Sequence, residues 1–171
     1  SGASAKMAAH VAHTRYEDLP PAVIHAFKRA LLDHVTCAVA GSAMPVSRAL
    51  LSYFQENDAS RVATVIAGSA KLSAANAALV NGANTHGLDF DDGHTQGSAH
   101  PSGAIFPAAL AAAEQYRCTP QQLMLSVVLG YDVMARIAAA MHPVTAQRGF
   151  HNTPLAGVFG AAAAVASLLK L

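Results

Sequence analysis

The sequence predicts an all-α fold: a single helical domain over residues 1–171, with five to seven packed helices and at most one short extended segment. Apolar residues recur at helical spacing in most segments, as at Val23, Phe27 and Leu31. Cap residues and prolines of the kind that start helices stand before several of these segments. Strands and helices do not alternate along the chain, which disfavours a doubly wound sheet.

The first half of the chain contains three predicted helices and the extended segment. Ser4 can cap the first helix, and Asp18 with the two prolines after Leu19 can start the second. Gly41 suits the position just after the second helix. The β-branched segment RVATVIAG is the one credible strand. The predicted helices cover residues 5–15, 21–40 and 45–55, and the extended segment covers residues 61–68.

The second half continues with helices. Ser73 can cap the helix AANAALVNGANTH, and Pro101 opens the helix SGAIFPAALAAAEQY. The pair Thr119-Pro120 begins a helix that runs to about residue 141. Within it, Asp132 and Arg136 are four residues apart, so they can pair on one face.

The last predicted helix runs from Pro154 to the end of the chain, with Asn152 or Thr153 as its cap. Its apolar stretch LAGVFGAAAAVASLL falls short of the roughly 18 residues that a membrane-spanning helix needs. We therefore expect a buried helix and no membrane association.

The composition is apolar and weakly charged. Hydrophobic residues make up 53% of the chain and charged residues 12%, about half of the usual ~25%. Such a surface predicts contact with another chain, either a second copy in a homo-oligomer or a complementing chain. The net charge of +1 and the lack of any Lys/Arg run give no support for nucleic-acid binding.

The cysteines and the N-terminus bear on location. Cys37 and Cys118 are far apart in predicted helices, which indicates two buried free thiols in a reducing compartment. The first residues, SGASAKMAAH, have no apolar stretch typical of a signal peptide and do not begin with Met. We therefore expect a cytoplasmic protein whose first residues are a tag scar or follow an excised segment.

Acids and bases are concentrated in one stretch, THGLDFDDGHTQGSAHPSG, at residues 85–103. It holds three carboxylates, three imidazoles and four glycines, and it lies between two alanine-rich helices. Unpaired carboxylates are costly to bury, so this context favours a functional role over the alternative of a solvated loop. The candidate residues in this stretch are Asp89, Asp92, His94, His100 and Ser102.

A divalent metal ion is a further alternative for this stretch, since aspartate and histidine are metal ligands. An EF-hand does not fit, because glycine occupies the fifth position counted from Asp89 and His100 occupies the twelfth. The D-x-D-D string is also similar to that of proton-donating terpene cyclases, which is a weak signal. We expect no metal and no cofactor.

A second histidine lies near a predicted helix start, in RGFHNTPLAGVFG. Arg148 precedes His151 by three residues, and guanidinium groups bind carboxylates bidentately. A capping loop with a surface arginine is the alternative. His100 also precedes a helix, and helix N-termini bind anions. These two pairs of a histidine and a helix N-terminus, together with the acidic stretch, predict a pocket for a small polycarboxylate.

The sequence contains no G-x-S-x-G, H-E-x-x-H, G-x-G-x-x-G or Walker loop, so hydrolase, zinc-protease and nucleotide-binding functions have no support.

Four segments resemble the N-terminal helical portion of the MmgE/PrpD family, and together they cover nearly the whole chain. They are LPPAVIHAFKRALLDHVTCAVAGS, AALVNGANTHGLDFDDGH with the later HPSGAIFPAALAAAE, VVLGYDVMARI, and GFHNTPLAGVFGAAAAVASLLKL. Members include 2-methylcitrate dehydratase and cis-aconitate decarboxylase. The resemblance implies a cofactor-independent, homodimeric lyase, whose active site lies between a helical domain and a smaller lid domain.

Members of the family are well over twice as long as this chain. The lid domain and the later lysine and tyrosine positions of the site have no counterpart here. The chain is therefore expected to be a fragment, a short homologue completed by another chain, or a homologue without catalysis.

The resemblance also implies roles for individual residues. It places the family's acidic-loop aspartate at Asp89 and its two histidines at His100 and His151, which we assign to catalysis. Many members have threonine at the position of Gly93, so the substrate stays open. The implied reaction is dehydration or decarboxylation of a tricarboxylic acid by acid–base catalysis. The alternatives are a non-catalytic helical assembly module and an epimerase or isomerase for a dicarboxylate. The secondary candidates, for substrate binding, are Asp92, His94, Ser102 and Arg148.

Overall fold

The structure is a computed structural model that describes residues 2–171. This part of the chain forms eight α-helices, which confirms the predicted all-α class. The number exceeds the predicted five to seven because α7 is a single extra turn. The helices are α1 (Ala3–His13), α2 (Pro21–Gly41), α3 (Pro45–Asn57), α4 (Ala74–His86), α5 (Ser102–Tyr116), α6 (Pro120–Met141), α7 (Val144–Gln147) and α8 (Asn152–Leu169).

The remaining regular structure is short. The predicted extended segment contains β1 (Ala63–Thr64), which pairs antiparallel with the unpredicted β2 (Lys71–Leu72). Two 3-10 turns, η1 (Tyr16–Asp18) and η2 (Thr95–Gly97), lie in connections. The hairpin packs beside α4 through Val65, which is buried.

The predicted starts of α2, α4 and α6 are correct, whereas α1 begins at Ala3, before the predicted cap Ser4. Thr119 and Gln122 form a reciprocal capping box, and α6 begins at Pro120 as predicted. The predicted ion pair inside α6 forms, with Arg136 Nε 2.9 Å from Asp132 Oδ1. By contrast, α8 begins two residues before the predicted Pro154, because the predicted cap Asn152 donates from Nδ2 to the carbonyl oxygen of Gly97.

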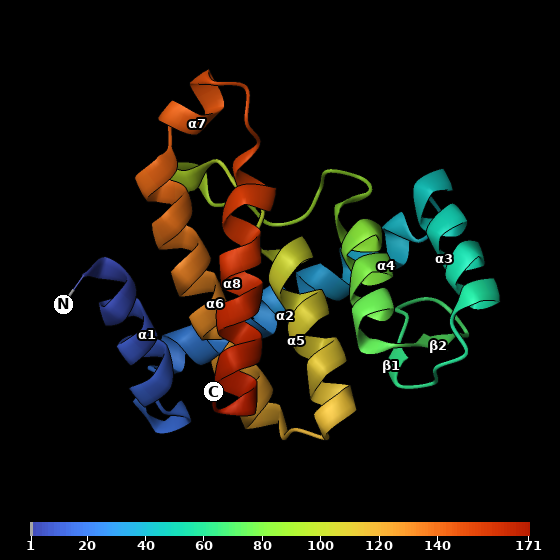
Figure 1. Ribbon diagram of the computed structural model, residues 1–171, viewed down its shortest axis with the longest axis horizontal. Coiled ribbons are helices and arrows are strands. Elements are labelled where there is room, and N and C mark those ends of the chain that lie inside the picture. The colour runs from blue at the N-terminus through green and yellow to red at the C-terminus, as the bar shows by residue number, and fades with distance from the viewer. Residues whose placement is uncertain (1) are drawn as a thin grey trace.

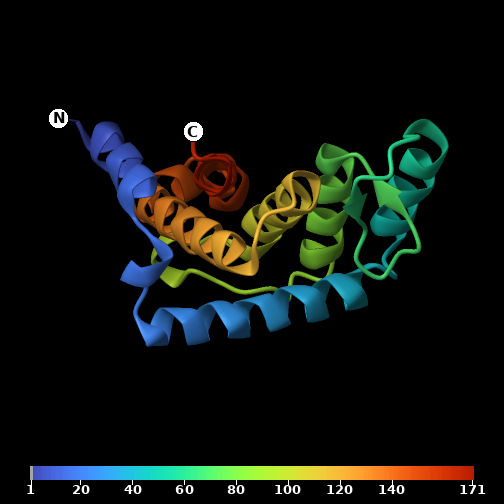
Figure 2. The ribbon, with the colours of Figure 1, turned by 90° about the horizontal axis from the view of Figure 1, so that it is seen from below.

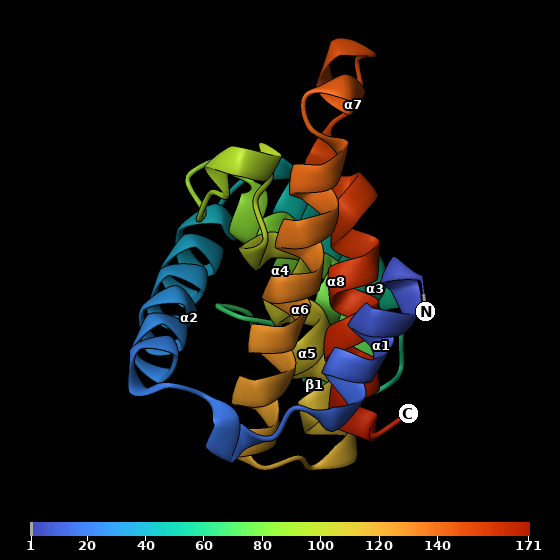
Figure 3. The same cartoon turned by 90° about the vertical axis from the view of Figure 1, so that its left-hand side faces the viewer.

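The helices form a row crossed by one long helix. In Figure 1, α6, α8, α5 and α4 lie next to one another, with α3 and the hairpin beyond α4. Figure 2 shows α2 running along one side of this row, where it contacts α4, α5 and α6. Figure 3 shows α7 projecting beyond the end of the row and α1 resting against α8.

Small residues allow α6 and α8 to pack closely. A Cβ atom added at Gly130 of α6 would lie 2.9 Å from the carbonyl oxygen of Gly160 in α8, so neither position accepts a side chain. Only one face of α8 is covered: Ala156 and Ala164 are buried, whereas Phe159 is exposed. The prediction of a buried final helix is therefore correct for one face alone.

The expectation that the last helix is too short to span a membrane is wrong. By length and composition, α6 and α8 could each cross a membrane, since α8 reaches 18 residues and α6 reaches 22. The structure has these two helices packed against each other and against η2 and α5. The cysteines fit their prediction more closely, because Cys37 is a buried free thiol and Cys118 is free and half-buried.

A buried histidine connects α2 to the segment that holds the acids and bases. His34 is fully buried, its Nδ1 lies 3.1 Å from Ser102 Oγ and 3.2 Å from Thr85 Oγ1, and its ring stacks on Phe106. Burial lowers the pKa of His34 from 6.5 to about 4. The ring is therefore neutral in the native protein at neutral pH.

This pKa shift predicts a loss of stability in acid. Between pH 6.5 and about 4, the unfolded chain binds a proton at His34 and the native chain does not, so stability falls as the pH falls. From pH 7 to pH 5 this one group should cost about 2 kcal/mol. Urea unfolding at both pH values, for the wild type and for His34→Gln, isolates the contribution. Equal losses in the two proteins would contradict the prediction.

Candidate active site

Three imidazoles from distant segments lie together at one end of the row of helices. His86 is the last residue of α4, His100 precedes α5, and His151 precedes α8. The ring of His86 is central, with its centroid 5.1 Å from that of His100 and 6.2 Å from that of His151. The structure thus brings the predicted His100 and His151 together and adds His86 between them.

A buried carboxylate orients two of these rings. Asp91 Oδ1 lies 2.9 Å from His86 Nδ1, and its side chain is fully buried. The same oxygen lies 3.5 Å from His100 Nδ1, which is also 3.3 Å from the carbonyl oxygen of Asp91. Carboxylate and carbonyl oxygens only accept hydrogen bonds, so each Nδ1 must carry the proton. Each ring therefore exchanges protons or binds ligands through Nε2.

The third predicted catalytic residue, Asp89, stands on the opposite side of the two rings. Its Oδ1 lies 3.9 Å from His86 Nε2 and 3.8 Å from His100 Nε2. Its backbone has a φ of 51°, in the left-handed region that aspartate tolerates better than most residues. The side chain is 78% exposed. An exposed carboxylate thus faces the Nε2 atoms of both imidazoles.

A cavity of about 510 Å³ adjoins the imidazoles. His86, His100 and His151 are part of its wall, and the buried Asp91 contributes behind them. The rest of the wall is mostly apolar and comes from α8 and from the start of α5. It consists of Gly103, Ala104, Thr153, Pro154, Gly157, Val158 and Ala161.

Two of the predicted binding residues, Asp92 and Ser102, have partners within the fold and do not line this cavity. Asp92 Oδ1 accepts a hydrogen bond of 2.8 Å from the backbone N–H of Ser102, and Asp92 Oδ2 accepts one from Tyr131. Burial raises the pKa of Asp92, which the two hydrogen bonds oppose. The N-terminus of α5, which we expected to receive a ligand anion, therefore holds a carboxylate of the chain itself.

The other two predicted binding residues also lie outside the wall of this cavity. His94 stands at the start of η2, where its Nδ1 accepts a hydrogen bond from the backbone N–H of Gly97. Arg148 is exposed in the turn after α7. In this structure His94 stabilises a turn, and Arg148 lies in the same α7–α8 connection as His151 without reaching the cavity wall.

Sequence reasoning missed His86 and Asp91, although both lie in the stretch it singled out. The available signal was their density, since His86 and Asp91 flank Asp89 within six residues. The sequence does not show which of the neighbouring aspartate side chains points into the protein. The left-handed turn at Asp89 sends Asp89 outward and Asp91 inward, and no helical or extended periodicity predicts that.

The same groups have the composition of a metal site. His86, Asp89, Asp91 and His100 can each offer one ligand atom, and these atoms lie within 4.8 Å of one another. Imidazole nitrogen and carboxylate oxygen are the donors that suit Zn²⁺ and related ions.

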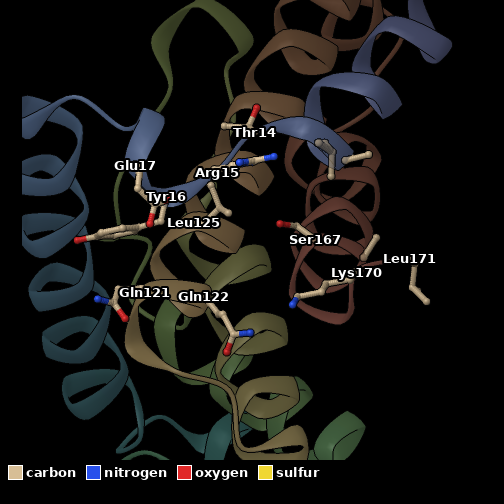
Figure 4. Close-up of a pocket in the computed structure, with 13 residues that line it drawn as sticks. Thr14, Arg15, Tyr16, Glu17, Gln121, Gln122, Leu125, Ser167, Lys170 and Leu171 are labelled. Atoms are coloured by element: carbon tan, nitrogen blue, oxygen red, sulfur yellow. The ribbon is translucent and has the colours of Figure 1, made fainter.

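A larger cavity, of about 680 Å³, lies elsewhere, between η1, α6 and α8 (Figure 4). Its wall includes the cations Arg15 and Lys170, and Glu17 is its one carboxylate. It contains no histidine. Acid–base chemistry is therefore better served by the cavity beside His86, although that cavity is smaller.

Comparisons with known proteins agree with the resemblance in sequence. A family model described as the MmgE/PrpD N-terminal domain matches residues 5–171. The cis-aconitate decarboxylase-like protein oryM of Aspergillus oryzae is 27% identical over 98% of this chain and 36% of its own length. Human cis-aconitate decarboxylase is 30% identical over 87% of this chain and 32% of its own length. The Aspergillus terreus enzyme of the same name is 26% identical over 100% of the chain and 36% of its length. The chain thus spans about a third of the curated relatives it matches.

Proposed function

Because this chain belongs to the MmgE/PrpD family, we propose that it supplies the helical wall of a lyase site for a tricarboxylic acid. The observation that carries the proposal is the convergence of His86, His100 and His151 on one cavity beside the buried Asp91. The relatives are named as cis-aconitate decarboxylases, which favours loss of CO₂ over loss of water.

The chemistry follows from the positions of the protons. When CO₂ leaves, the electron pair of the broken carbon–carbon bond stays on the substrate, and a carbon that shares this pair must receive a proton. His100 presents Nε2 for this transfer, since Asp91 occupies its Nδ1. His151, at the start of α8, binds a second substrate carboxylate beside the helix N-terminus. Asp89 accepts or returns a proton at the Nε2 side.

The apolar surface around the cavity supports closure of the site by a further polypeptide surface. Phe90 is 81% exposed and Val158 is 63% exposed, and both lie next to residues of the site. Exposed apolar side chains that form a contiguous patch mark interaction surfaces. We propose a second copy of the chain, or a complementing chain or domain, as the covering element.

Binding of polycarboxylates should be measurable without turnover. Citrate or tricarballylate in metal-free buffer should raise the unfolding temperature of the chain. At 100 times Kd the native state gains about 2.7 kcal/mol, which for a chain of this size is roughly 5–10 °C. Differential scanning fluorimetry measures the shift, with acetate at matched ionic strength as the control. His151→Ala should remove most of the shift.

The competing function is a non-catalytic assembly module. It predicts no shift with any polycarboxylate and a tight oligomer by light scattering, and that combination would overturn the proposal. A shift that survives in both His100→Ala and His151→Ala would place the binding site elsewhere.

A further inference from the structure

We propose that His86 Nε2, His100 Nε2 and the Asp89 carboxylate together bind a divalent transition-metal ion of the Zn²⁺ type. Two imidazoles and one carboxylate on adjacent segments are a donor set that such ions favour. The site has three protein ligands, which leaves one position of a tetrahedral ion for water or another donor. It does not depend on the proposed lyase activity.

The distances suit a small rearrangement. Ligands of a tetrahedral zinc ion, at bond lengths of about 2.0–2.1 Å, lie about 3.3 Å apart. Asp89 Oδ1 is 3.9 Å from His86 Nε2 and 3.8 Å from His100 Nε2, so a movement of roughly half an ångström closes the site. Asp89 is exposed, and its side chain is free to make that movement.

Asp91 provides the outer support that metal-binding histidines need. In protein metal sites the second ring nitrogen of a ligating histidine donates to a carboxylate or a carbonyl, which fixes the ring and the tautomer. Asp91 does this for both rings, through Oδ1 for His86 and through its carbonyl oxygen for His100. One residue thus orients both rings, and the Nε2 atoms of both lie near Asp89.

A second observation also points to a ligand. The side chain of Asp91 is fully buried, and its Oδ2 is without a hydrogen-bond partner among the described residues. An uncompensated carboxylate oxygen in the interior is costly. A dication bound to the far side of the two imidazoles would offset part of that charge through the rings that Asp91 contacts.

The ion and proton transfer exclude each other. A metal-bound Nε2 has no lone pair to accept a proton and no proton to donate. Where the proposed lyase function holds, Zn²⁺ is therefore an inhibitor, because it blocks proton transfer at both Nε2 atoms. Acid should weaken metal binding, because the imidazoles must be neutral to bind.

The test is isothermal titration of the chain with ZnCl₂ in a buffer that does not bind zinc. We expect one site per chain. Asp89→Ala and His86→Ala each remove a ligand and should weaken binding by more than the roughly 10–100-fold that loss of an outer partner costs. Asp91→Asn removes that outer partner, so its loss of zinc affinity should fall within this range. Asp89→Asn repeats the test with a residue that tolerates the left-handed backbone at this exposed position, so a loss of binding in both variants is due to the carboxylate.

The matched control is His10→Ala/His13→Ala, which removes two exposed histidines of α1. Zinc affinity should be unchanged in it. The inference is overturned if wild-type chain takes up no zinc, if the control loses binding while Asp89→Ala keeps it, or if Mg²⁺ binds as tightly as Zn²⁺. If citrate stabilises the chain but zinc does not bind, this inference is refuted and the lyase proposal stands. If zinc binds but citrate does not stabilise the chain, the lyase proposal is refuted and this inference stands.

Discussion

Replacing His100 by alanine in a catalytically complete form of this protein is expected to lower kcat by about 10²–10⁴-fold. The imidazole that donates or accepts the proton at Nε2 would be lost. The backbone would keep its place, because the N–H of His100 donates to Thr153 Oγ1 independently of the side chain. His151→Ala should lower kcat/KM at least as strongly as kcat, since its role is to hold a substrate carboxylate.

Steady-state kinetics with a cis-aconitate-type acid measures both effects. His13→Ala is the matched control, because it removes an exposed imidazole on α1, and its rate should equal that of the wild type. Near-normal turnover in both His100→Ala and His151→Ala would remove these residues from the chemistry.

A single methyl group added at Gly41 should be among the most destabilising small changes in the chain. Gly41 ends α2 where it crosses α4, and a Cβ atom there would overlap the backbone carbonyl oxygen of Asn84. Backbone cannot move aside as a side-chain tip does, so α2 must shift away from α4. Overpacking of this kind costs typically 1–3 kcal/mol, and we expect Gly41→Ala to cost about 3 kcal/mol.

Gly93→Ala is the control, since a Cβ atom at Gly93 would meet nothing within 4 Å. Chemical denaturation of the two variants beside the wild type gives the comparison. A loss below about 0.5 kcal/mol for Gly41→Ala, which is the usual range of surface substitutions, would show that α2 and α4 are not in contact there.

The sequence predicted elements well where the determinants are local. Helix α6 was predicted from its cap and first proline, and Thr119 and Pro120 act at that place alone. The start of α8 was misplaced because Asn152 is recruited by Gly97, more than fifty residues away. The pairing of β1 with β2 was likewise missed, since the second strand has only two residues and little pattern of its own.

The candidate site was predictable in composition and not in geometry. Residue types and helix starts singled out His100 and His151, and the structure has both in the wall of one cavity. The roles of the three aspartates depend on a left-handed turn at Asp89 and on the tertiary contact between Asp92 and Tyr131. Neither feature leaves a periodic signal in the sequence, so Asp91 was overlooked and Asp92 was assigned to the substrate.

The two faces of the cavity differ in the molecules they favour. Three imidazoles form one part of the wall, and hydrocarbon from Pro154, Val158 and Ala161 forms another. An acid whose carboxylates cluster at one end of a bare carbon skeleton meets both sides with matching groups. A polyhydroxylated sugar acid of equal charge would have to strip water from its hydroxyls against α8, so we expect discrimination by skeleton polarity in addition to charge.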